Sequence, residues 1–174
     1  LEWKFNLDQW VLAPPIVCDT NNDGYVEIVS VSYDGYIYCI NSSTGELLWK
    51  YNTGYSIYAE PVVGDVDCDG RLEVIVGNQN NILFCLNAED GSLLWRKKIE
   101  GGISISPLVA DLNGDNRLDI LVVAKKLYCI NGRNGEIIWQ LKLQENKPTT
   151  APVAWDIDED GKLEIIVPSG KNLV

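Results

Sequence analysis

The chain has 174 residues, which is long enough to bury a core without needing disulfides or metal ions on grounds of size alone. Its 25 acidic and 14 basic residues give a formal net charge of −11, which argues against a nucleic-acid or anionic-membrane partner. Histidine is absent, which excludes histidine-dependent catalytic triads and histidine zinc sites, and no apolar run reaches the ~20 residues of a membrane-spanning helix. Because methionine is also absent, we expect a processed or excised piece of a longer protein.

The chain is built from a repeated unit of about 45 residues. Four acidic segments recur every 45 or 46 residues and begin at Asp19, Asp65, Asp111 and Asp156. A second motif, which ends in tryptophan, recurs in phase with them at Trp49, Trp95 and Trp139. Trp3 lies 46 residues before Trp49 and continues this series. Two motifs with one period indicate an internal repeat rather than chance similarity.

Each unit predicts only short strands. In the second unit, an apolar stretch over 61–64 is followed by β-branched runs over 72–76 and 82–86, and a turn over 89–91 leads into a fourth strand at 93–95. Four short antiparallel strands in 40–50 residues are typical of a propeller blade. A β-sandwich is disfavoured because it does not need this period. The predicted class is therefore an all-β protein, a β-propeller of four-stranded antiparallel blades with four blades in this chain.

We expect one domain over residues 1–174, with repeats at approximately 4–49, 50–95 and 96–139, and a fourth formed by 140–174 plus 1–3. Val174 aligns with Cys129 and Leu1 with Ile137, so both termini flank one predicted turn of the fourth blade. Residues 1–3 are thus expected to supply the last strand of that blade. A closed four-bladed ring, part of a larger seven- or eight-bladed ring, and self-association by strand exchange between subunits all remain open.

The acidic segments predict metal-binding loops with the pattern Asp-x-Asp/Asn-x-Asp-Gly/Asn-x-apolar-Glu/Asp. Positions 1, 3, 5 and 9 offer side-chain oxygens and position 7 a backbone carbonyl, a set that suits a hard cation with 6–8 oxygen ligands. Ca²⁺ fits better than Mg²⁺, which demands a stricter octahedron, and the lack of nitrogen or sulfur ligands disfavours zinc and copper. We expect up to four Ca²⁺ ions, one for each loop.

The predicted ligands of loop one (residues 19–27) are Asp19, Asn21, Asp23, the carbonyl of Tyr25, and Glu27. Those of loop two (65–73) are Asp65, Asp67, Asp69, the carbonyl of Arg71, and Glu73. Those of loop three (111–119) are Asp111, Asn113, Asp115, the carbonyl of Arg117, and Asp119. Those of loop four (156–164) are Asp156, Asp158, Asp160, the carbonyl of Lys162, and Glu164.

Two differences among the loops predict unequal binding. Loop three has Asn116 where the others have glycine, although asparagine tolerates a left-handed backbone better than most residues. Loops one and three carry three carboxylates against four in the other two, so we expect them to bind more weakly.

An EF-hand is excluded because position 12 is never glutamate and strands follow. Simple Asx-capped turns are disfavoured because four such loops recur in register.

The acidic loops resemble the calcium loops of FG-GAP repeats, the integrin-α type of propeller. The segment Tyr-Cys-Ile-Asn-x-x-Thr-Gly-Glu-Leu-Leu-Trp at 38–49 resembles the blade motif of PQQ-like (quinoprotein) propellers. Together these resemblances cover nearly the whole chain and imply a β-propeller with structural calcium. They do not imply an enzyme, because the adjacent cysteine pair of quinoprotein dehydrogenases is missing.

Aromatic residues divide into two groups. The repeating Trp49, Trp95 and Trp139 are expected to pack between neighbouring blades. Trp10 and Trp155 fall outside that phase, and Tyr58 belongs to a tyrosine-rich connection, so these three are the tentative ligand-binding residues. The five cysteines are expected to be free thiols, because equivalent positions of adjacent blades lie too far apart for a disulfide.

The leading functional prediction is a calcium-stabilised, non-enzymatic propeller that serves as a structural, adhesion or protein-interaction module. Calcium loops of this kind favour an extracellular, cell-surface or periplasmic location, where calcium is millimolar. The expected partner is a protein or a surface glycan. One alternative is a lectin-like carbohydrate binder that uses Trp10, Trp155 or the tyrosines. Another is a fragment of a larger polysaccharide lyase or quinoprotein-type enzyme.

Overall fold

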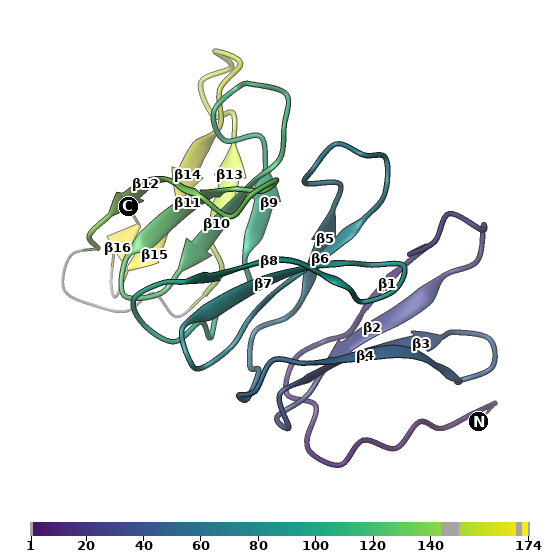
Figure 1. Cartoon of the computed structure of the whole chain (residues 1–174). Coiled ribbons are helices and arrows are strands. Elements are labelled where there is room, and N and C mark those ends of the chain that lie inside the picture. Colours follow the sequence, from purple (N-terminus) through teal and green to yellow (C-terminus); the bar gives the residue numbers. More distant parts are fainter. Residues whose placement is uncertain (1, 144–149, 170–171, 174) are drawn as a thin grey trace.

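The computed structural model describes residues 2–143, 150–169 and 172–173. Within these ranges the chain forms strands and no helix, and every strand pair is antiparallel (Figure 1). The first sheet, blade one, contains β1 (Ile16–Cys18), β2 (Glu27–Val31), β3 (Tyr36–Asn41) and β4 (Leu47–Asn52) in sequence order. Blade two repeats this order with β5 (Val62–Gly64), β6 (Glu73–Gly77), β7 (Ile82–Asn87) and β8 (Leu93–Lys98).

Blade three contains β9 (Leu108–Ala110), β10 (Asp119–Val123), β11 (Leu127–Asn131) and β12 (Ile137–Leu141), again in sequence order. The fourth unit begins in the same way, with β13 (Val153–Trp155) paired to β14 (Glu164–Ile166). It continues as the pair β15 (Pro168–Ser169) and β16 (Asn172–Leu173). The predicted all-β fold built from four-stranded antiparallel blades is confirmed, while the exact repeat boundaries stay a prediction.

The last hairpin of each complete blade has the same local chemistry. In blade two, the side-chain oxygen of Asn87 accepts the backbone N–H of Glu89, and the Gly91 N–H donates to the Asn87 carbonyl oxygen at 2.9 Å. Gly91 has a φ of +72°, a left-handed conformation that costs glycine little. A register shift follows Cys85, and the same shift occurs after Cys39 and Cys129. The repeated Asn-x-x-x-Gly sequence thus specifies the same bulged hairpin three times.

The hydrophobic core lies between neighbouring sheets. One cluster joins Val29 and Val31 of blade one to Val74 and Val76 of blade two, and all four side chains are buried. Similar clusters lie between blades two and three, and between blade three and the fourth unit. The second strands of blades two and three, β6 and β10, are buried on both faces because each of these sheets has a neighbour on either side. The five cysteines are free, as predicted.

The repeating tryptophans also cross these boundaries. The indole Nε1 of Trp95 donates to the Gly132 carbonyl oxygen at 2.8 Å, and its ring covers the turn at Gly135. Trp49 makes the equivalent contact with the turn of blade two. Trp139 packs against the cluster that joins blade three to the fourth unit. The predicted inter-blade role of these tryptophans is confirmed.

Of the arrangements that the sequence left open, the closed four-bladed ring does not occur in this structure. Trp3 packs on Gly45 and donates from Nε1 to the Ser42 carbonyl oxygen at 2.8 Å, so the N-terminal segment lies against blade one. Residues 2–15 form no strand, and Leu1 lies outside the described residues. Figure 1 shows blade one and the fourth unit at opposite ends of an arc of sheets. The apolar clusters join blade one to blade two, blade two to blade three, and blade three to the fourth unit, so the described sheets form an open row.

Candidate functional site

The four acidic loops occupy equivalent places in the fold. Each loop joins the first and second strands of its unit, and its ninth residue begins the second strand: β2 at Glu27, β6 at Glu73, β10 at Asp119 and β14 at Glu164. Figure 1 shows all four connections along one side of the molecule, its upper right edge in this view. The repeat therefore places four similar clusters of oxygen atoms along one side of the arc.

The loops share one backbone conformation. In loop two, the Asp65 carboxylate accepts the backbone N–H groups of Asp69 and Gly70, both at 3.1 Å. The first aspartate of every other loop accepts the same two N–H groups. The sixth residue is always left-handed, including Asn116 at a φ of +61°. The fourth residue is left-handed as well, at Asn22, Cys68, Gly114 and Glu159, and these varied residue types gave no sequence signal.

Loops two and four each bring three carboxylates together. The carboxylate oxygens of Asp65, Asp67 and Glu73 lie within 4.8 Å of one another and could hold a metal ion. In loop four, the same is true of Asp156, Asp158 and Glu164. Positions 1, 3 and 9 of the predicted ligand set therefore converge. In loops one and three, position 3 is asparagine, and its side-chain oxygen accepts the backbone N–H of position 5.

The carboxylate at position 5 and the residue at position 7 are joined by a hydrogen bond in each loop. Asp69 lies outside the three-carboxylate group, and its Oδ1 accepts the Arg71 backbone N–H at 2.8 Å. Asp160 likewise accepts the Lys162 N–H at 2.9 Å, and its Oδ2 lies 3.1 Å from the Lys162 ammonium. In loops one and three as well, the backbone N–H of position 7, at Tyr25 and Arg117, donates to the carboxylate of position 5. Direct ligation by positions 5 and 7 stays a prediction.

The carboxylate at position 9 is buried in loops one to three. Oε2 of Glu27 accepts the backbone N–H and the hydroxyl of Thr20, at 2.9 and 2.7 Å. Oε2 of Glu73 accepts the Val66 N–H at 2.8 Å. Burial raises the pKa of Glu73 to about 7, and repulsion from the nearby aspartates adds to the effect. A cation at this position would offset both costs.

Asp119 in loop three has a buried carboxylate oxygen without a hydrogen-bond partner. Its side chain is only 1% exposed, and Oδ2 is the single buried side-chain polar atom without a hydrogen-bond partner among the described residues. Burial, with repulsion from Asp115, raises the pKa of Asp119 to about 6. A buried, unpaired carboxylate oxygen is costly, and a bound cation would satisfy it. The all-oxygen donor set and this unpaired oxygen therefore fit a hard cation.

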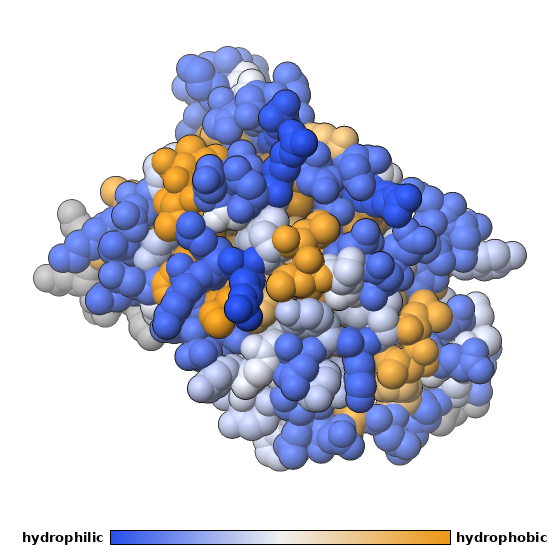
Figure 2. All heavy atoms as spheres, in the orientation of Figure 1, coloured by the Kyte–Doolittle hydropathy of each residue, from blue (hydrophilic) through white to orange (hydrophobic). Residues whose placement is uncertain are grey.

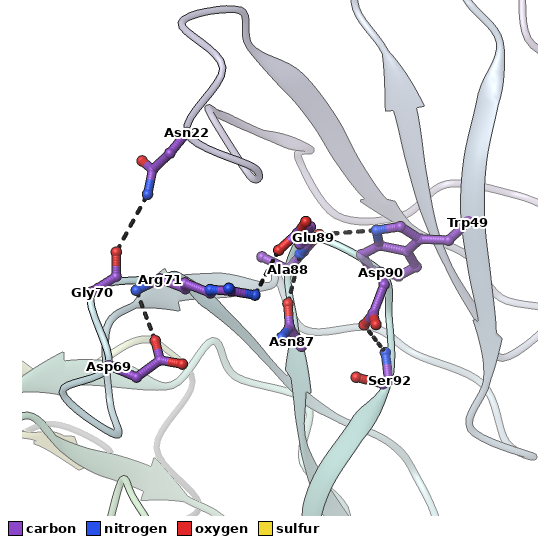
Figure 3. Close-up of polar contacts among 10 residues, drawn as sticks. All are labelled: Asn22, Trp49, Asp69, Gly70, Arg71, Asn87, Ala88, Glu89, Asp90 and Ser92. Carbon is purple, nitrogen blue, oxygen red and sulfur yellow. Dashed lines mark hydrogen bonds and ion pairs between the residues drawn. The ribbon is translucent and has the colours of Figure 1, made fainter.

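Loop two is linked to its neighbours (Figure 3). The Asn22 side chain of loop one donates to the Gly70 carbonyl oxygen at 3.3 Å. Arg71 pairs with Glu89 at 2.9 Å, and Glu89 lies in the turn that receives Trp49. Sequence reasoning did not assign a role to the side chains of Asn22 or Arg71, because each belongs to a position that varies between loops.

The structure separates the three candidate ligand-binding residues, with two in one pocket and the third elsewhere. Trp10 and Tyr58 line one pocket together with Gln9, Leu12 and Tyr33, and its volume is about 440 Å³. Trp155 lies elsewhere, at the end of β13 and beside loop four. The pocket residues come from three separate connections, so no local pattern marked Gln9, Leu12 or Tyr33.

Comparison with known proteins identifies the family. A family model described as outer membrane protein assembly factor BamB matches residues 33–154, which is more than half of the chain. The chain belongs to this family. The match supports the resemblance to PQQ-like propeller repeats, whereas the resemblance of the loops to FG-GAP repeats stays a prediction. A second model, described as a lambda-carrageenase β-propeller domain, matches residues 1–63. A search of curated proteins gave no match.

Solved structures show the same fold as this BamB-family chain. BamB from Moraxella catarrhalis has a TM-score of 0.70 at 17% identity, covering 97% of this chain and 46% of that one. The V. cholerae biofilm matrix protein Bap1 has a TM-score of 0.68 at 23% identity, covering 94% and 29%. Quinohemoprotein alcohol dehydrogenase from Comamonas testosteroni has a TM-score of 0.61 at 16% identity, covering 81% and 22%. The chain thus spans less than half the length of these proteins.

No helix in the described part of the chain is long and apolar enough to cross a membrane.

Proposed function

We propose that this chain is a calcium-stabilised propeller segment that acts in protein binding or assembly outside the cytoplasm, and not as an enzyme. The observation that carries the proposal is the match of residues 33–154 to the family of an outer membrane assembly factor. A propeller presents its strand connections on two faces, and connections that vary over a rigid scaffold suit the recognition of a partner.

Calcium is the proposed ion of the acidic loops. The converging carboxylates of loops two and four, and the unpaired oxygen of Asp119, support a hard cation with oxygen ligands. The proposed role is structural, because each loop opens the second strand of a blade and loop two is tied to the blade boundary. An ion that binds such loops weakly would be retained only where calcium is millimolar, which supports an extracellular, cell-surface or periplasmic location.

A binding role rather than catalysis is supported by the chemistry of the nucleophile candidates. The chain has no histidine, and its clustered carboxylates are accounted for by the proposed ion. Burial raises the pKa of Cys39 and Cys129 to about 12, so both remain protonated thiols at neutral pH.

Exposed apolar residues on the outermost strands offer a contact surface for a protein partner. β4, β8 and β12 each present an exposed apolar pair, at Leu47–Leu48, Leu93–Leu94 and Ile137–Ile138. Figure 2 shows apolar side chains gathered in separate patches within a mainly hydrophilic surface. Outer strands with free edges can also accept a strand from a partner, which keeps self-association by strand pairing within the proposal.

Thermal unfolding with calcium, with magnesium and with EGTA tests the calcium part of the proposal. Binding to the native state must stabilise it, by about 2.7 kcal/mol when free calcium is 100 times the dissociation constant. We expect calcium to raise the melting temperature and magnesium to raise it less. An unchanged melting temperature in EGTA would rule out these sites.

Incubation with pyrroloquinoline quinone, calcium, an alcohol and an electron acceptor tests the enzyme alternative, and we expect no turnover.

A second candidate function is carbohydrate binding. The matched carrageenase propeller model covers residues 1–63, and this segment holds all five residues of the aromatic pocket. A glycan array tests this function independently of calcium, and the absence of binding to any sugar would eliminate it.

A further inference from the structure

The aromatic pocket is an exposed site built from three connections of the chain. Gln9, Trp10 and Leu12 precede β1, Tyr33 lies in the turn between β2 and β3, and Tyr58 lies between β4 and β5. Its volume of about 440 Å³ falls within the range of small-ligand sites. Trp10 is 76% exposed, so most of its indole surface is open to a ligand. Large aromatic surfaces are seldom left in water without a binding role when they gather in a concave site.

The walls of the pocket are held in place by the backbone. The Tyr33 N–H donates to the Trp10 carbonyl oxygen at 2.9 Å, which ties the N-terminal segment to the β2–β3 turn. Tyr58 lies between Ile57 and Ala59, which are both buried and anchor its connection. The rings of Tyr33 and Tyr58 meet edge to face, with centroids 5.7 Å apart. The site is therefore largely formed before a ligand arrives, which lowers the cost of binding.

The polar groups of the pocket residues are all neutral. They are the amide of Gln9, the indole N–H of Trp10 and the hydroxyls of the two tyrosines, and the described residues that line the pocket include no charged side chain. The charged residues next to them in the chain are acidic, at Asp8, Asp34 and Glu60. The lining residues offer no basic side chain to pair with an anionic ligand, which disfavours a sulfated glycan or a nucleic acid. A neutral ligand with hydroxyl groups and an apolar face matches this chemistry.

We propose that this pocket binds a neutral pyranose unit of a glycan, with the sugar ring stacked on Trp10 and its hydroxyls hydrogen-bonded by Gln9, Tyr33 and Tyr58. This inference rests on the second candidate function and adds its site and ligand class. A quaternary ammonium ion fits less well, because Tyr33 and Tyr58 contact each other and leave no cation-sized gap between them.

In the experiment, the full chain in calcium is titrated with cellohexaose, laminarihexaose and neutral agaro-hexaose. Binding is measured by calorimetry and by tryptophan fluorescence. A sulfated carrageenan hexaose, choline chloride and a proline decamer are the competing probes. We expect at least one neutral hexaose to bind and the competing probes not to bind. Trp10→Ala should weaken binding about tenfold or more, because the stacking surface is lost. Tyr58→Phe, which keeps the ring and removes the hydroxyl, should weaken it about threefold.

Leu141→Ala is the control, because Leu141 is 51% exposed, lies outside the pocket and has no proposed ligand-binding role. It should leave sugar affinity unchanged, and equal melting temperatures of the two alanine variants would show that both fold. Absence of binding by every neutral hexaose, preference for a competing probe, or retained binding in Trp10→Ala would overturn the proposal. Loss of calcium-dependent stability with intact sugar binding would count against the calcium sites alone. Sugar binding on an array that survives Trp10→Ala would preserve carbohydrate binding but reject this site.

Discussion

The indole Nε1 of Trp49 donates a hydrogen bond to the carbonyl oxygen of Ala88, 2.9 Å away, across the boundary between blades one and two. The same indole ring covers Gly91, so close that a Cβ there would lie 2.6 Å from ring carbon Cε3 of Trp49. Trp95 and Trp3 make equivalent contacts with the turns of blades three and one. Blade one is therefore joined to blade two, and blade two to blade three, by a directional hydrogen bond as well as by apolar packing.

Removing the Trp49 hydrogen bond should destabilise the chain. Trp49→Phe keeps an aromatic ring but leaves the buried Ala88 carbonyl without its donor, which costs about 1–3 kcal/mol before any loss of packing. Urea unfolding followed by circular dichroism measures the change. Trp155→Phe is the control and should stay within about 0.5 kcal/mol of the wild type, because Trp155 is exposed. Equal stability of the two variants would contradict the proposed energetic role of the bond.

The turn glycine should be more sensitive to substitution than its backbone conformation alone requires. Gly91→Ala adds a left-handed strain of about 1–2 kcal/mol and also forces the Trp49 ring away from the turn. Gly54→Ala is a matched control, since Gly54 has a φ of +84° but nothing within 4 Å of its Cβ position. The prediction is that Gly91→Ala lowers the free energy of unfolding clearly more than Gly54→Ala does. If both lower it equally, the tryptophan contact contributes nothing.

Neutralising Asp119 should have opposite effects with and without metal. In EGTA, Asp119→Asn removes a buried carboxylate charge and should raise the free energy of unfolding by roughly 1 kcal/mol or more. In excess calcium the variant should gain less stability than the wild type, because one ligand is weakened. Paired thermal scans in the two buffers measure both effects. A variant that is destabilised equally in the two buffers would show that Asp119 has only a packing role.

The number of carboxylates should set the affinity of each loop. Asp67→Asn gives loop two the composition of loops one and three, and should weaken one class of calcium site about tenfold. Asn21→Asp makes the reverse change in loop one and should strengthen its site. Calorimetric titration resolves the classes. Glu136→Gln removes an exposed carboxylate outside the loops and should leave the titration unchanged, so an equal effect of this variant would point to general electrostatics rather than specific ligation.

The repeat unit could be predicted from the sequence because the strands and turns of a blade are specified by residues that lie close together in the chain. The period of the two motifs, the β-branched runs and the Asn-x-x-x-Gly turn specify hairpins through nearest neighbours alone, and the structure has these hairpins where the pattern placed them. The tryptophans were also predictable, since a large apolar residue in phase with the repeat must meet the neighbouring blade. The acidic loops were recognisable for the same reason: their spacing is local.

Three features were decided by the tertiary structure. The convergence of Asp65, Asp67 and Glu73 without Asp69 depends on two left-handed residues and on the start of β6, which the spacing pattern does not encode. The open arc depends on how neighbouring sheets pack, through clusters whose residues come from two different blades. The aromatic pocket joins Trp10 to Tyr33 and Tyr58 through contacts between connections that are distant in sequence. Local pattern determined the blade, whereas long-range packing determined how the blades and their loops meet.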